Sequence, residues 1–315
     1  MHLNKTVAVV VPAYNEAELI AKAISAVPAF VDTIIVVDDA STDRTAGIVK
    51  DLIESDSRIE LVVHLSNQGV GGAIVSGYKK ALAMAVDVTA VMAGDAQMDP
   101  DDLLDLIEPV CRNEVDYAKG NRLFTGEAWS MIPKVRYIGN AFLSLLTKVA
   151  SGYWQVADSQ CGYTAISGTA LQHIPLNSIH KRYGMPNDML VKLNIENMRV
   201  RDVEVKPVYD IGEESGIRIW KDGPFITLLL LQGFFKRLTY KYIIRDFHPL
   251  VFFYFLGLSL TPAGTLLGLY LLILRATGTP VAATSALFAS FLFISGLQSL
   301  FFAMWFDMEY NKNLK

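Results

Sequence analysis

Acidic and polar side chains follow directly after three short apolar runs in the N-terminal part of the chain. The runs Val7–Val11, Thr33–Val37 and Thr89–Met92 are followed by PAYNE, DDASTD and AGDAQMDP. Clustered carboxylates repel a nucleoside diphosphate unless a cation offsets their charge, and a hard divalent metal binds one or two carboxylates together with phosphate oxygens. A turn or a helix cap explains a lone aspartate such as Asp43 or Asp101. Turns and caps explain poorly why acidic residues follow three strands at once. The pattern therefore indicates a metal-assisted site for a phosphate-bearing ligand.

The elements that must position these side chains alternate between strand and helix. The three runs above and Ile59–His64 are short and apolar, as buried strands are, whereas Glu16–Val27, Asp43–Glu54 and Gly71–Ala85 have helical patterns. We expect Ser41 or Thr42 to cap the second helix. The alternation predicts an α/β domain with a mainly parallel sheet, whose ligands bind at the carboxyl ends of the strands.

A glycine-rich turn, NQGVGGA at 67–73, precedes the third helix. It matches neither a Walker sequence nor a dinucleotide fingerprint. Two explanations stay open: contact with a phosphate, or a tight turn that lets the helix pack closely on the sheet.

Two long uncharged segments lie near the end of the sequence, about 249–274 and 281–306. A helix needs about 20 apolar residues to cross a bilayer, so both segments are predicted to span one. Only RATGTP separates them, which predicts a hairpin with both ends on one side. Lys236, Arg237, Lys241 and Arg245 precede the first span, and basic flanks mark the cytoplasmic side. We therefore expect an integral membrane protein with its catalytic domain in the cytoplasm.

The segment between the two parts, FITLLLLQGFFKRLTYKY at 225–242, is apolar at first and then basic. It is predicted either to lie in the membrane interface or to be a core helix of the first domain. The expected organisation is a domain at 1–223, a juxtamembrane amphipathic region at 224–248, and a hairpin with a short cytoplasmic tail at 249–315. Gly257, Gly264 and Gly296 could pack against another subunit, giving a homo-oligomer, or within the hairpin.

Composition excludes some classes of function. The 315 residues carry a formal net charge of −4, which disfavours nucleic acid as a partner. Cys111 and Cys161 have no metal-ligand spacing and are expected to be reduced thiols. The first residues lead straight into a β-rich run, so no signal peptide is predicted.

The motifs VVPAYNE, VVDDASTDRT, NQGVGGA, GDAQMDP, KGNR and DSQCGY occur in this order. Together they resemble glycosyltransferase family 2, which has the GT-A fold. With a C-terminal hairpin, the subgroup that the chain resembles is that of the polyprenyl-phosphate glycosyltransferases, which includes the dolichol-phosphate mannose and glucose synthases. The resemblance implies a hexosyltransferase of glycan or cell-envelope biosynthesis. It would transfer a sugar, with inversion, from a UDP- or GDP-sugar to undecaprenyl or dolichyl phosphate, using Mg²⁺ or Mn²⁺.

The resemblance also implies roles for residues on the donor side. Those that would line the nucleotide pocket or contact base and ribose are Pro12, Tyr14, Glu16, Asp39 and Ser41. Asp95 and Gln97 would hold the metal and the diphosphate. The family's Asp-x-Asp-x-Gln reads AGDAQ here, so Ala93 stands where the first aspartate is usual. Asp99 is expected to begin the next helix with Pro100.

Arginines and one acidic residue are implied on the acceptor side. Arg122 and Arg136 resemble arginines that hold the acceptor phosphate, a task suited to planar guanidinium groups. The later R-x-x-G-x-S-K pattern is incomplete, so Arg218 or Lys221 would substitute for its basic residues at the donor diphosphate. Asp188 matches the acceptor-side acidic residue and would be a base or an orienting group; its alternative is a helix N-cap.

Two other functions stay open. A membrane glycosyltransferase acting on a glycolipid or lipid-linked glycan would need a base, because its acceptor is a hydroxyl group. A non-catalytic sugar-nucleotide-binding membrane protein is the second and less favoured one, and Ala93 keeps it open. The chain has no Q-x-x-R-W motif, which argues against a processive polysaccharide synthase.

Overall fold

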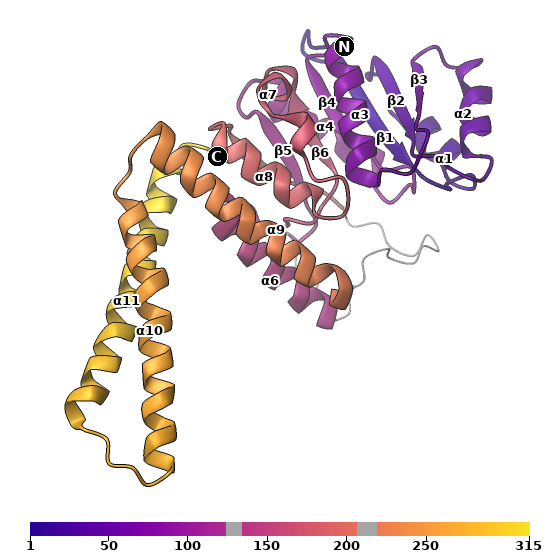
Figure 1. Ribbon diagram of the computed structural model, residues 1–315. Helices are drawn as coiled ribbons and strands as arrows, with labels where there is room; N and C mark the ends of the chain where they lie inside the picture. The colour runs from indigo at the N-terminus through magenta and orange to yellow at the C-terminus, as the bar shows by residue number, and fades with distance from the viewer. Residues whose placement is uncertain (124–133, 207–218) are drawn as a thin grey trace. The chain divides into compact units, whose positions relative to one another are not determined.

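The computed structural model describes residues 1–123, 134–206 and 219–315. These divide into two compact units, the first formed by Met1–Phe235 with Leu314–Lys315 and the second by Lys236–Asn313. The first unit is an α/β domain and the second contains two long helices (Figure 1).

The first unit is built on a seven-stranded sheet within the described residues, in the order β3-β2-β1-β4-β6-β5-β7. Only β6 runs antiparallel to its neighbours, β4 and β5; the other pairs are parallel. The strands are β1 Val7–Ala13, β2 Thr33–Asp38, β3 Ile59–Val63, β4 Val88–Val91, β5 Tyr117–Asn121, β6 Thr164–Ser167 and β7 Val200–Glu204. The predicted mainly parallel α/β sheet is confirmed.

Helices cover both faces of this sheet (Figure 1). Val7, Val9 and Val11 of β1 belong to one apolar cluster and Ala8 and Val10 to another, because side chains alternate between the faces of a strand. The helices of the first unit are α1 Ile20–Ser25, α2 Thr45–Ile53, α3 Val70–Ala83, η1 Pro100–Asp102, α4 Leu103–Cys111, α6 Lys134–Ser151, α7 Gly168–His173, η2 Leu176–Ser178, α8 Met185–Ile195 and most of α9 Ile219–Thr239.

Two helix starts test the expectations about caps. Neither Ser41 nor Thr42 caps α2; Asp43 instead accepts hydrogen bonds from the backbone nitrogen and the hydroxyl group of Thr45, at 2.9 and 2.5 Å. The N-cap residue of α2 is Arg44, which makes no side-chain capping bond, so the predicted cap was wrong by two to three residues. Asp99 caps η1, where its side chain accepts from the Asp101 nitrogen at 3.0 Å, as expected from the Asp-Pro sequence.

The glycine-rich turn packs against another loop. A Cβ on Gly69 or Gly71 would lie 2.6 Å from the Lys181 carbonyl oxygen or 2.5 Å from that of His180. Gly69 also has a φ of 87°, which favours glycine. Further along α3, a Cβ on Gly77 would lie 2.3 Å from Val10 of β1. Close packing therefore accounts for the glycines of this segment.

Helix α9 has one buried apolar stripe, formed by Ile226, Leu230 and Phe234. Within the first unit, Gly233 of α9 lies against Val191 of α8, and Leu229 of α9 lies against Gly184 just before α8. Phe225, Leu228, Leu231 and Phe235 are exposed on the remaining surface of α9. The helix thus combines a core face with an exposed apolar face; its placement in a membrane interface stays a prediction.

The second unit contains α10 Leu250–Ala276 and α11 Ala283–Tyr310, preceded by the π-helical segment η3 Tyr240–Arg245. Both long helices are apolar enough to cross a membrane, with mean hydropathies of 1.7 and 1.8. Gly264 and Gly296 lie inside the hairpin: a Cβ on Gly264 would come within 2.4 Å of the Phe293 nitrogen, and one on Gly296 within 2.4 Å of the Thr261 nitrogen. These glycines let the two helices approach closely.

A buried polar cluster ties the start of the second unit to the end of α11. Arg237 binds both carboxylate oxygens of Asp307, at 2.8 and 3.0 Å, and both side chains are almost fully buried. Tyr242 donates to Asp307 at 2.5 Å, and Lys241 donates to Asn311 at 2.8 Å. Burial and the charge of Arg237 lower the pKa of Lys241 to about 7. Two of the four basic residues before the first span therefore point inward.

This cluster predicts a large cost for removing its carboxylate. Asp307→Ala leaves the Arg237 guanidinium buried without its ion-pair partner, which costs about 3–5 kcal/mol of stability. Thermal unfolding of the full chain in detergent measures the loss. Glu309→Ala is the matched control, because Glu309 pairs with Lys312 on the surface and such pairs contribute under about 1 kcal/mol. Equal shifts in the two variants would contradict the prediction.

Candidate active site

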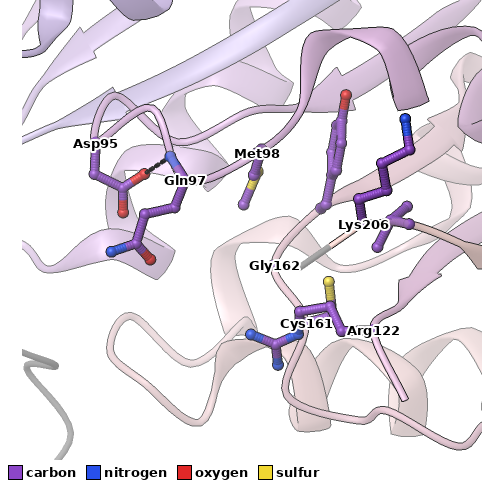
Figure 2. Close-up of a pocket in the computed structure, with 9 residues that line it drawn as sticks. Asp95, Gln97, Met98, Arg122, Cys161, Gly162 and Lys206 are labelled. Atoms are coloured by element: carbon purple, nitrogen blue, oxygen red, sulfur yellow. Dashed lines mark hydrogen bonds between the residues drawn. The ribbon is translucent and has the colours of Figure 1, made fainter. Parts of the chain in front are cut away.

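A pocket of about 70 Å³ lies where the loops after β4, β5 and β7 meet the segment before β6. Figure 2 shows Asp95 and Gln97 on one side of it and Arg122 with Cys161 on the other. The residues that line it are Asp95, Gln97, Met98, Arg122, Cys161, Gly162, Tyr163, Val205 and Lys206. The structure thus brings three predicted site residues, Asp95, Gln97 and Arg122, to one place.

The loop after β4 presents the candidate metal ligands. Asp95 Oδ1 accepts a hydrogen bond from the Gln97 backbone nitrogen at 3.0 Å, drawn as a dashed line in Figure 2. Ala96 between them has a φ of 56°, and a non-glycine residue in this region costs on the order of 1 kcal/mol. Asn15 and Ala40, after β1 and β2, have φ values of 57° and 61°. Each of the three strand-end loops thus contains one such position.

The donor set around Asp95 fits a hard divalent cation. Carboxylate and amide oxygens are the ligand type that Mg²⁺ and Mn²⁺ prefer. Among the residues that the structure describes, no group of three or more His, Cys, Asp and Glu side chains could hold a metal. Where a protein supplies only one or two ligands, substrate phosphates and water complete the shell of such a cation.

The loops after β1 and β2 lie beside this pocket. The Gly94 nitrogen donates to the Pro12 carbonyl oxygen at 3.2 Å, which joins the loop after β4 to β1. The Asn15 nitrogen donates to Ser41 Oγ at 2.9 Å, and the Glu16 nitrogen donates to Thr45 Oγ1 at 2.8 Å. The side chain of Tyr14 is exposed. The predicted nucleotide-side residues therefore share one edge of the sheet.

Asp39 makes several contacts within the protein. Its Oδ1 accepts from the Gln68 nitrogen at 2.8 Å and its Oδ2 from the Gly69 nitrogen at 2.7 Å. His64 Nδ1 lies 2.6 Å from Oδ1, and His64 Nε2 lies 2.8 Å from Ser76 Oγ. Asp39 is 2% exposed. Its carboxylate therefore holds the glycine-rich turn against β2.

Arg122 is held by an aspartate that sequence reasoning did not single out. Its Nε donates to Asp158 Oδ2 at 2.8 Å and its Nη2 to Oδ1 at 3.2 Å. Nearby, Lys119 Nζ donates to the Cys161 carbonyl oxygen from inside β5. Asp158 belongs to DSQCGY and Lys119 to KGNR, so both lay within quoted motifs.

Asp188 does not line the pocket. It lies in the first turn of α8, whose N-cap is Gly184, so it is not the N-cap itself. Its Oδ2 accepts from the His180 nitrogen at 2.7 Å and from Lys192 Nζ. The adjacent Asn187 accepts from Gln160 at 3.0 Å, which places the start of α8 against the segment that carries Asp158.

Three residues predicted for the site, or their side chains, fall outside what the structure describes. Arg218 lies in the undescribed residues 207–218, as does the GEESGIR sequence around it. Arg136 falls in α6, but its side chain, like that of Lys221 in α9, is outside the description. Lys206, just before the second gap, is an additional cation on the pocket, 3.9 Å from Asp99.

The sequence profile described as Glycosyl transferase family 2 matches residues 8–174. The chain belongs to this family. It is 30% identical over 219 residues to a UDP-N-acetylglucosamine–dolichyl-phosphate N-acetylglucosaminyltransferase of Methanococcus voltae, covering 65% of this chain and 87% of the relative. It is 28% identical over 212 residues to an undecaprenyl-phosphate mannosyltransferase of Micrococcus luteus, covering 65% and 85%.

Solved structures agree on the fold. Glucosyl-3-phosphoglycerate synthase of Mycobacterium tuberculosis, crystallised with Mn²⁺, UDP and glucosyl-3-phosphoglycerate, superposes with a TM-score of 0.55 at 18% identity. The match covers 74% of this chain and 80% of that one. The protein is therefore a glycosyltransferase with a GT-A-like sheet, followed by two apolar helices that are candidate membrane spans.

The contacts of Asp39 generate a prediction. The Gln68 and Gly69 nitrogens donate to different carboxylate oxygens of Asp39, whereas an asparagine side chain offers a single acceptor oxygen. Asp39→Asn should therefore lower the free energy of unfolding by about 1.5–3 kcal/mol. Thermal unfolding measures this, and Asp56→Asn is the control because Asp56 and its partner Arg58 are both partly exposed. A variant with unchanged unfolding but lost nucleotide binding would instead make Asp39 a direct ligand contact.

Proposed function

We propose that this glycosyltransferase transfers a sugar, with inversion, from a UDP- or GDP-sugar to a polyprenyl phosphate at the cytoplasmic face of a membrane. The observation that carries the proposal is the pocket in which Asp95 and Gln97 face Arg122 and Lys206. Oxygen ligands on one side suit a metal–diphosphate complex, and cations on the other suit a second phosphate. The named activities of the two relatives and the apolar hairpin support the lipid acceptor.

The proposed reaction is a direct displacement. An oxygen of the acceptor phosphate attacks the anomeric carbon while the bond to the nucleoside diphosphate breaks. Asp95 and Gln97 would hold Mg²⁺ or Mn²⁺, which offsets the charge of the diphosphate when bound. Arg122, with Arg136 as a further candidate, orients the acceptor phosphate and offsets its charge. Lys206 adds a further cation on the side of Arg122, and Arg218 is a candidate for the same task at the leaving diphosphate.

A phosphate acceptor removes the need for a strong base. Its second pKa is about 6, so it is largely dianionic at neutral pH. Asp188, whose Oδ2 binds the His180 nitrogen and Lys192, is proposed as an orienting group or base on this side. A hydroxyl acceptor, by contrast, would make the base essential.

A donor-by-acceptor screen tests the main proposal. The full chain in membranes is incubated with radiolabelled UDP- and GDP-sugars and with undecaprenyl phosphate, dolichyl phosphate, undecaprenol or diacylglycerol. We expect labelled lipid only with the two phosphates, with Mn²⁺ or Mg²⁺ required and Asp95→Ala inactive. Asp105→Ala, on an exposed position of α4, is the matched control. Transfer to diacylglycerol but to neither phosphate would overturn the proposal.

Asp188→Asn tests the acceptor-side role. Turnover should fall at least about 100-fold if Asp188 acts as a base, in line with the usual contribution of acid–base catalysis. Donor binding, measured by isothermal titration with UDP or GDP and Mn²⁺, should stay unchanged. Glu196→Gln, just after α8, is the control, because it also replaces one carboxylate by an amide. Unaltered turnover of Asp188→Asn would remove this residue from the mechanism.

A further inference from the structure

A buried carboxylate holds Arg122 from behind the pocket. Asp158 is 3% exposed and receives two side-chain hydrogen bonds from the guanidinium, with oxygen–nitrogen distances of 2.8 and 3.2 Å. The Arg122 backbone nitrogen also points to Oδ2, at 3.4 Å. This two-point geometry fixes both the position and the plane of the guanidinium.

The charge state of Asp158 favours this pair. Burial opposes its ionisation, but the charge and the hydrogen bonds of Arg122, with the charge of Lys119, hold the pKa of Asp158 below its usual range. The carboxylate is therefore ionised at neutral pH. An ionised acidic group that holds an arginine is a poor proton acceptor, so Asp158 is not suited to be the base.

The segment that carries Asp158 is itself anchored on both sides. Before it, the Ala157 nitrogen donates to Asp202 Oδ2 of β7 at 2.7 Å, and Asn121 of β5 donates to the same oxygen at 3.2 Å. After it, the Cys161 carbonyl accepts from Lys119 of β5. Lys119 is fully buried and burial lowers its pKa, while burial raises the pKa of Asp202 to about 6. Two strands thus determine where Asp158 lies.

We propose that Asp158, in a segment anchored by Lys119 and Asp202, is the positioning residue for Arg122. It acts on the acceptor phosphate only through this arginine. An arginine side chain without such a partner samples many rotamers, and ordering it on binding costs conformational entropy. The pair with Asp158 orders Arg122 before the acceptor binds, so this cost does not reduce the affinity for the acceptor. The inference rests on the proposed function, because the acceptor phosphate is the group that Arg122 is proposed to hold.

The kinetic test compares Asp158→Asn with Asp116→Asn in the full chain. Asp116 is a matched control: it binds Arg199 through the backbone nitrogen, Nε and Nη2, away from the pocket. With undecaprenyl phosphate as acceptor, Asp158→Asn should raise the acceptor KM at least about tenfold and leave the donor KM within about twofold. Asp116→Asn should change neither. An unchanged acceptor KM in Asp158→Asn would overturn the proposal.

A labelling test needs no acceptor. Phenylglyoxal modifies exposed guanidinium groups, and peptide mass spectrometry follows the rate at each arginine. Arg122 should react several-fold faster in Asp158→Asn than in the unmodified chain, and Arg199 should do so in Asp116→Asn. Equal rates at Arg122 would overturn the positioning role. Absence of sugar transfer to any polyprenyl phosphate by the unmodified chain would overturn the proposed function instead, so the two failures are distinguishable.

A double variant guards against misfolding. If Asp158→Asn does not fold, Asp158→Asn with Arg122→Gln removes both charges and leaves no unpaired ion. Because the guanidinium is absent, its acceptor KM should be raised as in Arg122→Gln alone. A folded double variant with the acceptor KM of the unmodified chain would overturn the proposal.

Discussion

The common direction of six strands is the constraint on which the candidate site depends. β6 is antiparallel to both β4 and β5, so β5 runs the same way as β4 although the two are not neighbours. The loops that follow β1, β2, β4, β5 and β7 therefore emerge at one edge of the sheet. Side chains separated by more than a hundred residues, such as Asp95 and Lys206, then line one pocket without any long-range sequence signal.

Helices cover both faces of the sheet, so its central strands are buried on both sides. This double burial explains which parts of the fold could be predicted from sequence. Strands such as Val7–Ala13 are buried on both sides and read as continuous apolar runs. Their positions, and the loops at their ends, could thus be predicted from sequence within one or two residues. The reversed strand β6 could not, because TAIS is short and its neighbours are distant in the sequence.

The roles of single charged residues were harder to predict, because their partners come from remote segments. Asp39 is predicted to contact a nucleotide, and the structure shows in addition that its carboxylate binds backbone nitrogens of the glycine-rich turn. Arg122 was found through KGNR, but its partner Asp158 lies 36 residues further on. Arg237 was counted in a positive flank, but it is buried against Asp307 at the end of α11. A motif or a charge count indicates which residues gather in a region. Only the packed structure shows which of them face a ligand or solvent and which hold their neighbours.

In the proposed reaction, Ala93 affects how the charge of the donor diphosphate is offset, because it stands where the family usually has an aspartate. A loop with one carboxylate, Asp95, and one amide, Gln97, holds a divalent cation more weakly than a loop with two carboxylates. It also repels an incoming diphosphate less. Oxygen atoms of the donor would then be needed as further ligands, so that cation and nucleotide would bind as a pair. On the opposite side, Asp158 neutralises part of the charge of Arg122 but fixes its direction. The site thus relies on orientation more than on net charge, which suits a displacement between two phosphate-bearing substrates.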